Sequence, residues 1–205
     1  MIKNNIQAVI FDFGGVLVDW SPHNLYRHYF EQPQDIDRFL KEIDFAEWNA
    51  QQDRGRPFAQ AVAEHSAKFP QHAPLIKAYR ERWEDFIVGP IEGTIAILKE
   101  LKRLGYPLYG LSNWSAETFP VVQGKYRFFE LFDDILISGK VGMIKPEPGI
   151  FHLLLKRIKL EARDCLFIDD SESNIKTAAG IGFDTILFIS PEQLGTELRS
   201  RNILD

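Results

Sequence analysis

Cysteine is almost absent from this sequence of 205 residues: Cys165 stands alone, so no disulfide bond can form within the chain. The sequence also lacks an apolar run of membrane-spanning length, and its first residues lack the cleavage site of a signal peptide. Positive charge is not in excess, because the net charge is −5. The composition therefore argues against nucleic acid and anionic membrane as partners. We expect a cytoplasmic protein, either a monomer or a small homo-oligomer.

What the sequence does contain is a series of short apolar runs. Such runs predict parallel strands that are buried on both faces, here at residues 6–11, 107–111, 135–137, 165–168 and 185–189. Helical patterns lie between them at 92–104, at 149–158 after Pro148, and from Ser171, a candidate N-cap, to near Gly180. This alternation predicts an α/β fold with a doubly wound, Rossmann-like parallel sheet.

The stretch between about Asp19 and Pro90 differs from the rest of the chain. It shows no convincing strand pattern, and its aromatic residues recur in helix-like patterns interrupted by prolines. We therefore predict a small α-helical cap inserted after the first strand. The cap would comprise residues 19–89, between core segments 1–18 and 90–205.

Polar residues follow three of the predicted strands. Asp12 ends the first, Ser112 follows the second, and Asp169 and Asp170 follow the fourth. In an open parallel sheet the ligand crevice lies beyond the carboxyl ends of the strands, so we expect these residues to converge. Any one of them could simply begin a turn. Together they predict a functional site.

Converging carboxylates repel one another and raise one another's pKa values unless a cation lies between them. Oxygen ligands indicate Mg²⁺ rather than zinc, since the five histidines are scattered and there is no cysteine cluster. Lys145 precedes Pro146, which restricts its backbone. A fixed ammonium group beside the carboxylates could neutralise both a nucleophile and a phosphate group.

The order of these motifs resembles that of the haloacid dehalogenase-like (HAD) hydrolase superfamily. The four matching segments, in chain order, are Asp12–Asp19, Leu111–Asn113, Lys145–Pro148 and Phe167–Asn174. Order and spacing agree from residue 6 to about residue 190. The predicted insert also resembles the small helical cap of the phosphatase-type branch.

The resemblance implies a phosphohydrolase that acts on a small phosphomonoester, of which a sugar phosphate is one candidate. Asp12 would attack phosphorus and form an aspartyl-phosphate, and its carboxylate is ionised at neutral pH without an activating base. Ser112 and Asn113 would hold the phosphoryl oxygens. Lys145 would complete the charge balance.

The same resemblance implies a set of Mg²⁺ ligands. These are the carboxylates of Asp12 and Asp170 and the backbone carbonyl of Gly14, with Asp169 acting directly or through water. Gly14 also marks a departure, because most phosphatases of the superfamily carry there an Asp that protonates the leaving group. That group is typically worth about 10²- to 10⁴-fold in rate. Its absence predicts a strong dependence on the leaving group, unless another residue, from the cap or Asp169, replaces it.

Two other functions remain open from the sequence. The first is a 2-haloacid dehalogenase, in which Asp12 would attack carbon without a metal. The paired Asp169 and Asp170 speak against it, because their charges would be unfavourable near Asp12 without a cation. The second is a non-catalytic module that binds a phosphorylated ligand. A Cys165 nucleophile is the weakest alternative, since this cysteine opens an apolar strand.

Substrate choice is expected to lie in the cap. The segment that contains Trp48, Asn49 and residues 53–56 could form a loop facing the crevice, where Arg54 or Arg56 could hold a second anionic or polar group. A solvated surface turn is the alternative interpretation of this segment. Trp114 follows the second motif and could line the mouth of the site or pack in the core.

Overall fold

A five-stranded sheet forms the centre of the molecule in the computed structural model, which describes residues 6–205. All its strands are parallel, in the order β5-β4-β1-β6-β7. Their bounds are β1 (Ala8–Phe11), β4 (Leu108–Ser112), β5 (Asp134–Ile137), β6 (Cys165–Asp169) and β7 (Asp184–Leu187). The predicted doubly wound α/β sheet is confirmed, and the strand ends differ from the predicted ones by one or two residues.

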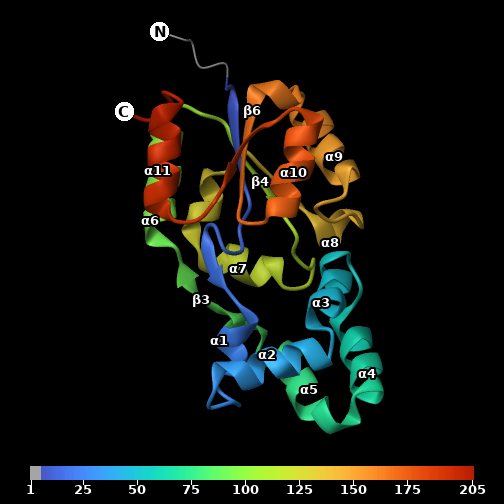
Figure 1. Cartoon of the computed structure of the whole chain (residues 1–205). Coiled ribbons are helices and arrows are strands. Elements are labelled where there is room, and N and C mark those ends of the chain that lie inside the picture. Colours follow the sequence, from blue (N-terminus) through green and yellow to red (C-terminus); the bar gives the residue numbers. More distant parts are fainter. Residues whose placement is uncertain (1–5) are drawn as a thin grey trace.

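Helices cover both faces of this sheet (Figure 1). One face carries α6 (Glu92–Arg103) and α11 (Pro191–Ser200), and the other carries α9 (Pro148–Ile158) and α10 (Glu172–Ile181). Strand β1 serves both layers, because successive side chains of a strand point to opposite faces. Val9 and Phe11 pack into one hydrophobic cluster, whereas Ala8 and Ile10 pack into the other. This explains why the strand is apolar throughout.

The helix ends follow the sequence signals with one exception. Pro148 begins α9, and Gly105, at φ +87°, follows the end of α6. Ser171 stands at the N-cap of α10, but its side chain does not cap the helix. Its hydroxyl lies 2.9 Å from Ser173 Oγ, while its backbone N–H donates to Asp169. The carboxylate of Asp169 therefore anchors this helix start.

Shorter elements complete the core. They are α7 (Phe119–Lys125), α8 (Ser138–Val141) and the 3₁₀ turns η3 (Arg127–Leu131) and η4 (Ala162–Asp164). Among residues 6–205, no helix has both the length and the apolar character needed to cross a membrane.

Five helices lie between Ser21 and Phe86, and this part of the chain is called the cap below. They are α1 (Pro22–Tyr26), α2 (Pro33–Glu42), α3 (Phe45–Asp53), α4 (Phe58–Lys68) and α5 (Ala73–Glu81), with the 3₁₀ turns η1 (Pro70–His72) and η2 (Trp83–Phe86) beside α5. The prolines in this part lie at or next to helix starts instead of interrupting helices. In Figure 1 the cap lies at the end of the core that is remote from both termini.

The expectation that residues 19–90 contain no strand is wrong at both ends of that stretch. Strands β2 (Val18–Trp20) and β3 (Ile87–Pro90) pair antiparallel and connect the cap with the core. They are too short to show a periodic pattern, and their pairing joins residues far apart in sequence. Only the tertiary structure brings them together.

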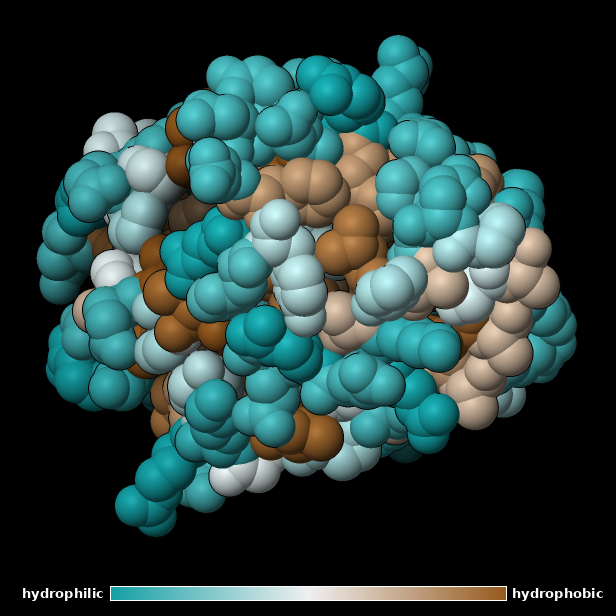
Figure 2. Space-filling view, turned by 90° about the horizontal axis from the view of Figure 1, so that it is seen from below, coloured by the Kyte–Doolittle hydropathy of each residue, from teal (hydrophilic) through white to brown (hydrophobic). Residues whose placement is uncertain are grey.

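An aromatic cluster forms the interior of the cap. Tyr26, Phe45, Trp48, Tyr79 and Phe86 contact one another through their rings and are almost fully buried. Large aromatic rings bury much apolar surface per residue, which suits so small a helical unit. Seen from the cap end of the molecule, the surface is mostly hydrophilic, with small separate apolar areas (Figure 2).

Candidate active site

Three neighbouring strands deliver the central residues of the site. Asp12 directly follows β1, Ser112 ends β4 and Asp169 ends β6, and β1 lies between the other two strands. The chain runs from β1 outwards through β4 to β5 and then returns to β6 on the other side of β1. Ligands bind at such a reversal of strand order in open α/β sheets. The structure thus brings together residues that lie about a hundred positions apart.

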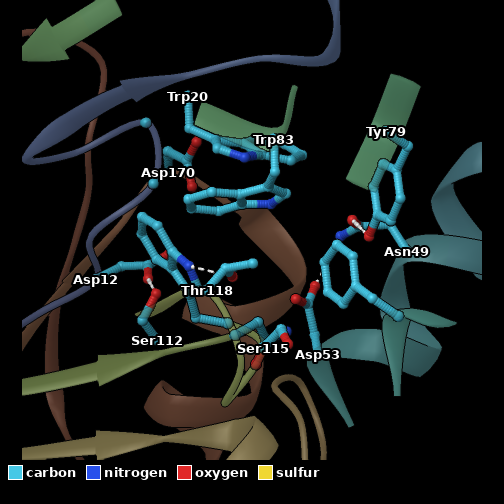
Figure 3. A pocket seen from close by; sticks show the side chains of 15 residues that line it. Asp12, Trp20, Asn49, Asp53, Tyr79, Trp83, Ser112, Ser115, Thr118 and Asp170 are labelled. Atoms are coloured by element: carbon cyan, nitrogen blue, oxygen red, sulfur yellow. Dashed lines mark hydrogen bonds between the residues drawn. The ribbon is translucent and has the colours of Figure 1, made fainter. Parts of the chain in front are cut away.

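The carboxylate of Asp12 is held by three donors on one oxygen. Its Oδ1 accepts hydrogen bonds from Ser112 Oγ (2.7 Å; Figure 3) and from the backbone N–H of Phe13 (2.7 Å), and Lys145 Nζ lies 2.9 Å away. Within residues 6–205, no hydrogen bond reaches Oδ2. The side chain is therefore fixed through Oδ1, and Oδ2 has no hydrogen-bond partner among the described residues.

Lys145 is fully buried beneath this carboxylate. Its Nζ donates to the backbone oxygen of Leu111 (2.8 Å) and to Asp169 Oδ2 (2.6 Å), in addition to the contact with Asp12. Burial alone would lower the pKa of the ammonium group, but Asp12 and Asp169 outweigh it and raise this pKa. Lys145 therefore remains charged between two carboxylates.

Asn113 fixes the backbone at Lys145. Its Nδ2 donates to the carbonyl of Lys145 (2.9 Å), and its Oδ1 accepts from the N–H of the same residue (2.8 Å). A primary amide has two N–H donors, so the contact with Lys145 uses only one of them. Asn113 also belongs to the lining of the cavity described below.

The two carboxylates after β6 have different surroundings. Asp169 is completely buried, and its oxygens accept from Lys145, from the N–H of Ser171 and from Asn174 Nδ2. Asp170 is exposed to the cavity. Its carboxylate passes close to Gly15 (φ +74°), where a Cβ atom would lie 2.1 Å from Asp170 Oδ2. Any other residue at position 15 would therefore be strained.

The donor set fits a hard divalent cation. One carboxylate oxygen each from Asp12, Asp169 and Asp170 lies within 4.8 Å of the others. Burial, together with Asp169 and Asp170, raises the pKa of Asp12 to about 7 despite the nearby Lys145. Burial and Asp169 likewise raise the pKa of Asp170. The cluster therefore has more negative charge than Lys145 can balance, and oxygen-only ligands favour Mg²⁺.

A cavity of about 320 Å³ opens beside Asp12. Core and cap both contribute to its lining, which includes no lysine, arginine or histidine among the described residues. Five aromatic side chains form much of its wall: Trp20, Phe58, Tyr79, Trp83 and Trp114. The sequence left open whether Trp114 lines the mouth of the site or packs in the core. It lines the cavity, is nearly buried and donates its indole N–H to Thr118 Oγ1 at 3.1 Å.

Neither arginine of the cap segment lines this cavity. The Arg54 guanidinium lies 2.6 Å from a carboxylate oxygen of Glu147, which belongs to the Lys-Pro-Glu-Pro motif of the core. Arg56 pairs with Glu64 at 2.9 Å and contacts the side chain of Gln51. Arg54 thus connects the cap with the core, whereas the contacts of Arg56 lie within the cap.

Asp53 and Asn49, from the same segment, do line the cavity. Figure 3 shows them with Tyr79 on the side of the cavity opposite Asp12 and Ser112. Burial and the charge of Asp12 raise the pKa of Asp53 to about 7, although Lys145 acts in the other direction. The sequence interpretation named this loop but gave Asp53 no role. One signal could have identified it. Because position 14 is glycine instead of the usual acid/base Asp, a carboxylate elsewhere in the predicted cavity-facing loop was a candidate for that role.

Cys165 is remote from this chemistry. It is buried at the start of β6 and is not part of the cavity lining. Burial and the neighbouring Asp164 raise the pKa of its thiol to about 12. A thiol with such a pKa is not an effective nucleophile at neutral pH.

Comparison with known proteins agrees with this geometry. The chain belongs to the haloacid dehalogenase-like hydrolase family, whose model matches residues 6–182. It is 27% identical to the sesquiterpene phosphatase astK of Aspergillus oryzae, with 86% of each chain covered. An enzyme of this family from Bacteroides thetaiotaomicron, solved with magnesium and inorganic phosphate, superposes with a TM-score of 0.67 at 26% identity, covering 90% of this chain and 95% of that chain.

Some relatives are much longer than this chain. The mouse acyl-CoA dehydrogenase family member 10 is 41% identical over 95% of this chain, which spans 19% of that protein. A match to the drimenol cyclase drtB of Aspergillus calidoustus, at 37% identity, covers 49% of this chain and 19% of that protein.

Proposed function

We propose that this chain is a magnesium-dependent phosphomonoester hydrolase that works through an aspartyl-phosphate on Asp12. The observation that carries the proposal is the arrangement around Asp12. One oxygen of this carboxylate is fixed by Ser112, Phe13 and Lys145, and acidic side chains suited to a cation adjoin it at the edge of an open cavity.

The reaction has two displacements at phosphorus. Asp12 Oδ2 attacks the phosphorus atom, and the bond from phosphorus to the ester oxygen breaks. Water then attacks the same phosphorus and releases Asp12 and inorganic phosphate. Ser112 keeps Asp12 oriented, while Lys145 offsets negative charge beneath it. Such catalysis relies mainly on positioning and electrostatics.

A bound Mg²⁺ would be held by Asp12, the Gly14 carbonyl and Asp170, with Asp169 directly or through water. It would supply positive charge for the phosphoryl oxygens. Because Asp169 already accepts from Lys145, Ser171 and Asn174, we favour the water-mediated role for Asp169.

The cavity wall supports a monoester whose organic group is uncharged. Aromatic faces accommodate apolar groups and the apolar faces of sugar rings, and no cationic side chain in the described lining could bind a second anion. Sugar monophosphates and apolar alkyl monophosphates therefore both fit, whereas bisphosphates and phosphorylated carboxylic acids do not.

The test is phosphate release from a panel of monophosphates and bisphosphates, with Mg²⁺ or with EDTA. We expect Mg²⁺-dependent turnover of monophosphates whose organic group is uncharged. The Asp12→Asn variant should show no turnover. Halide release from 2-haloacids in EDTA would instead establish the dehalogenase. Binding of phosphate esters without any turnover would establish the non-catalytic module.

A further inference from the structure

We propose that Asp53 of the cap performs the acid/base step for which Gly14 provides no side chain. It would protonate the departing ester oxygen and later accept a proton from the attacking water. The inference rests on the proposed phosphohydrolase function and adds a catalytic residue to it.

The position of Asp53 suits this role. It ends α3 and lines the cavity on the side opposite Asp12 (Figure 3). In-line displacement requires the leaving oxygen to depart from phosphorus on the side opposite the attacking oxygen. A substrate whose phosphorus faces Asp12 therefore directs its ester oxygen towards the side of the cavity where Asp53 lies.

The contacts of Asp53 orient its carboxyl group without neutralising it. Asn49 Nδ2 donates to Asp53 Oδ2 at 2.8 Å, and Asn49 Oδ1 accepts from the hydroxyl of Tyr79 at 2.8 Å. Within residues 6–205, no lysine, arginine or histidine forms an ion pair with Asp53. Oδ2 is therefore occupied, and Oδ1 is available to the cavity.

The protonation state of this group fits an acid that also acts as a base. The pKa of Asp53 is about 7, so both forms are present near neutral pH, as proton transfer in both directions requires. The titratable groups that influence it are Asp12 and Lys145 across the cavity, and Tyr79, whose own pKa is raised by burial and by Asp53.

The backbone that presents Asp53 is fastened to the core. Ser138 Oγ donates to the carbonyl of Asp53 at 2.5 Å and accepts from the N–H of Trp114 at 2.9 Å. Gly55, at φ +105°, packs so closely that a Cβ atom would lie 2.9 Å from the carbonyl oxygen of Gly139.

Two side-chain contacts strengthen this attachment on either side of Gly55. Arg54 pairs with Glu147, and the N–H of Phe58 donates to Glu117 at 2.9 Å. The loop is thus held against the core at several points. Asp53 therefore keeps its place facing the nucleophile.

Atoms and charges balance in both steps. As Asp12 forms its bond to phosphorus, the ester bond breaks and the proton of the Asp53 carboxyl group moves to the leaving oxygen. Asp53 is then a carboxylate. When water attacks the aspartyl-phosphate, its proton moves to Asp53, the bond from phosphorus to Asp12 breaks, and both side chains return to their initial states.

The experiment compares single-turnover phosphorylation of the holoenzyme with aryl and alkyl monophosphates of increasing leaving-group pKa. Single-turnover rates report the first step even when hydrolysis of the intermediate is slow. We expect a shallow dependence for the unmodified protein. In the Asp53→Asn variant this dependence should become steep. The phosphorylation rate should fall about 10²- to 10⁴-fold with alkyl phosphates and little with nitrophenyl phosphate.

Glu47→Gln is the matched control, because Glu47 is an exposed carboxylate on the same helix outside the cavity lining. It should leave both rates unchanged. A rescue variant is also available: a Cβ atom at Gly14 would meet only Trp20 Cβ at 3.9 Å. Gly14→Asp combined with Asp53→Asn should therefore regain alkyl-phosphate turnover.

An equal loss on all substrates, or a change in KM alone, would reduce Asp53 to a binding or structural residue. An unmodified protein that already shows the steep dependence would overturn the proposal as well. Failure of the proposed function would give a different result from these two outcomes, because Asp12 of the unmodified protein would then not become phosphorylated with any substrate.

Discussion

The ammonium nitrogen of Lys145 lies 2.9 Å from Asp12 Oδ1 and 2.6 Å from Asp169 Oδ2. All three side chains are buried or nearly so, and one positive charge therefore serves two carboxylates from different strands. This relationship connects the stability of the core to the chemistry of the site. It also determines what substitutions here will do.

Removal of the ammonium group should destabilise the protein strongly. Lys145→Met leaves buried carboxylates without their counterion, which typically costs about 3–5 kcal/mol in the free energy of unfolding. Adding Asp169→Asn removes one of those charges and should restore part of the stability but no activity. Urea unfolding of the single and double variants measures both effects, and strictly additive losses would contradict the coupling.

Replacement of the nucleophile should separate activity from folding. Asp12→Asn keeps the size of the side chain while removing its nucleophilic charge. We expect no turnover and no phosphorylated protein by mass spectrometry, with the circular dichroism spectrum unchanged. Substantial turnover by a clean preparation of this variant would assign the nucleophile elsewhere.

The two carboxylates after β6 should respond differently to substitution. Asp170→Asn should raise the Mg²⁺ concentration needed for half-maximal rate with little change in stability, because Asp170 is exposed to the cavity. Asp169→Asn should mainly lower stability through Lys145. Full activity of EDTA-treated protein would rule out the metal role of this pair.

Stability of the metal-free protein should fall as the pH rises. The pKa values of Asp12 and Asp53 are raised from 3.8 to about 7 in the folded state. Between these values the folded protein binds more protons than the unfolded chain, so the free energy of unfolding decreases with rising pH and levels off above about pH 7.

Mg²⁺ should counteract this loss by compensating the charge on Asp12. Its effect on Tm should therefore be larger near about pH 8 than near about pH 5. In Asp53→Asn the pH slope should shrink while the Mg²⁺ effect persists, because Asp53 is not a proposed ligand. Thermal unfolding with EDTA and with Mg²⁺ provides the measurement, and a Mg²⁺ effect independent of pH is the contrary result.

Arg54 should not select substrates. Its guanidinium pairs with Glu147 outside the cavity lining, and exposed ion pairs contribute little to stability. Arg54→Ala and Glu147→Gln should therefore have the same small effect on each substrate rate, because both remove the same ion pair. Rates that shift relative to one another in Arg54→Ala alone would return this residue to the substrate-binding role expected from the sequence.

The sequence by itself determined the α/β class, the parallel sheet and the motif residues at strand ends. These follow from local signals: an apolar run such as residues 8–11 can be satisfied only between two covered faces, and Asp12 lies where such a strand must end. Asp12, Ser112 and Asp169 were identifiable for this reason, whereas Lys145 was identifiable from its Lys-Pro-Glu-Pro motif. The structure places these residues in contact.

Only the tertiary structure decided which cap residues face the site. Arg54 and Asp53 are neighbours in one loop, yet Arg54 pairs with Glu147 while Asp53 lines the cavity. The directions in which these two side chains point depend on the contacts of the loop with the core. Ser138 donates to the carbonyl of Asp53, and Gly55 packs against Gly139. The pairing of β2 with β3 was likewise undetectable, since its register joins Val18 to Pro90. Short-range patterns contain no information about such contacts, because the free energy that favours them comes from partners distant in sequence.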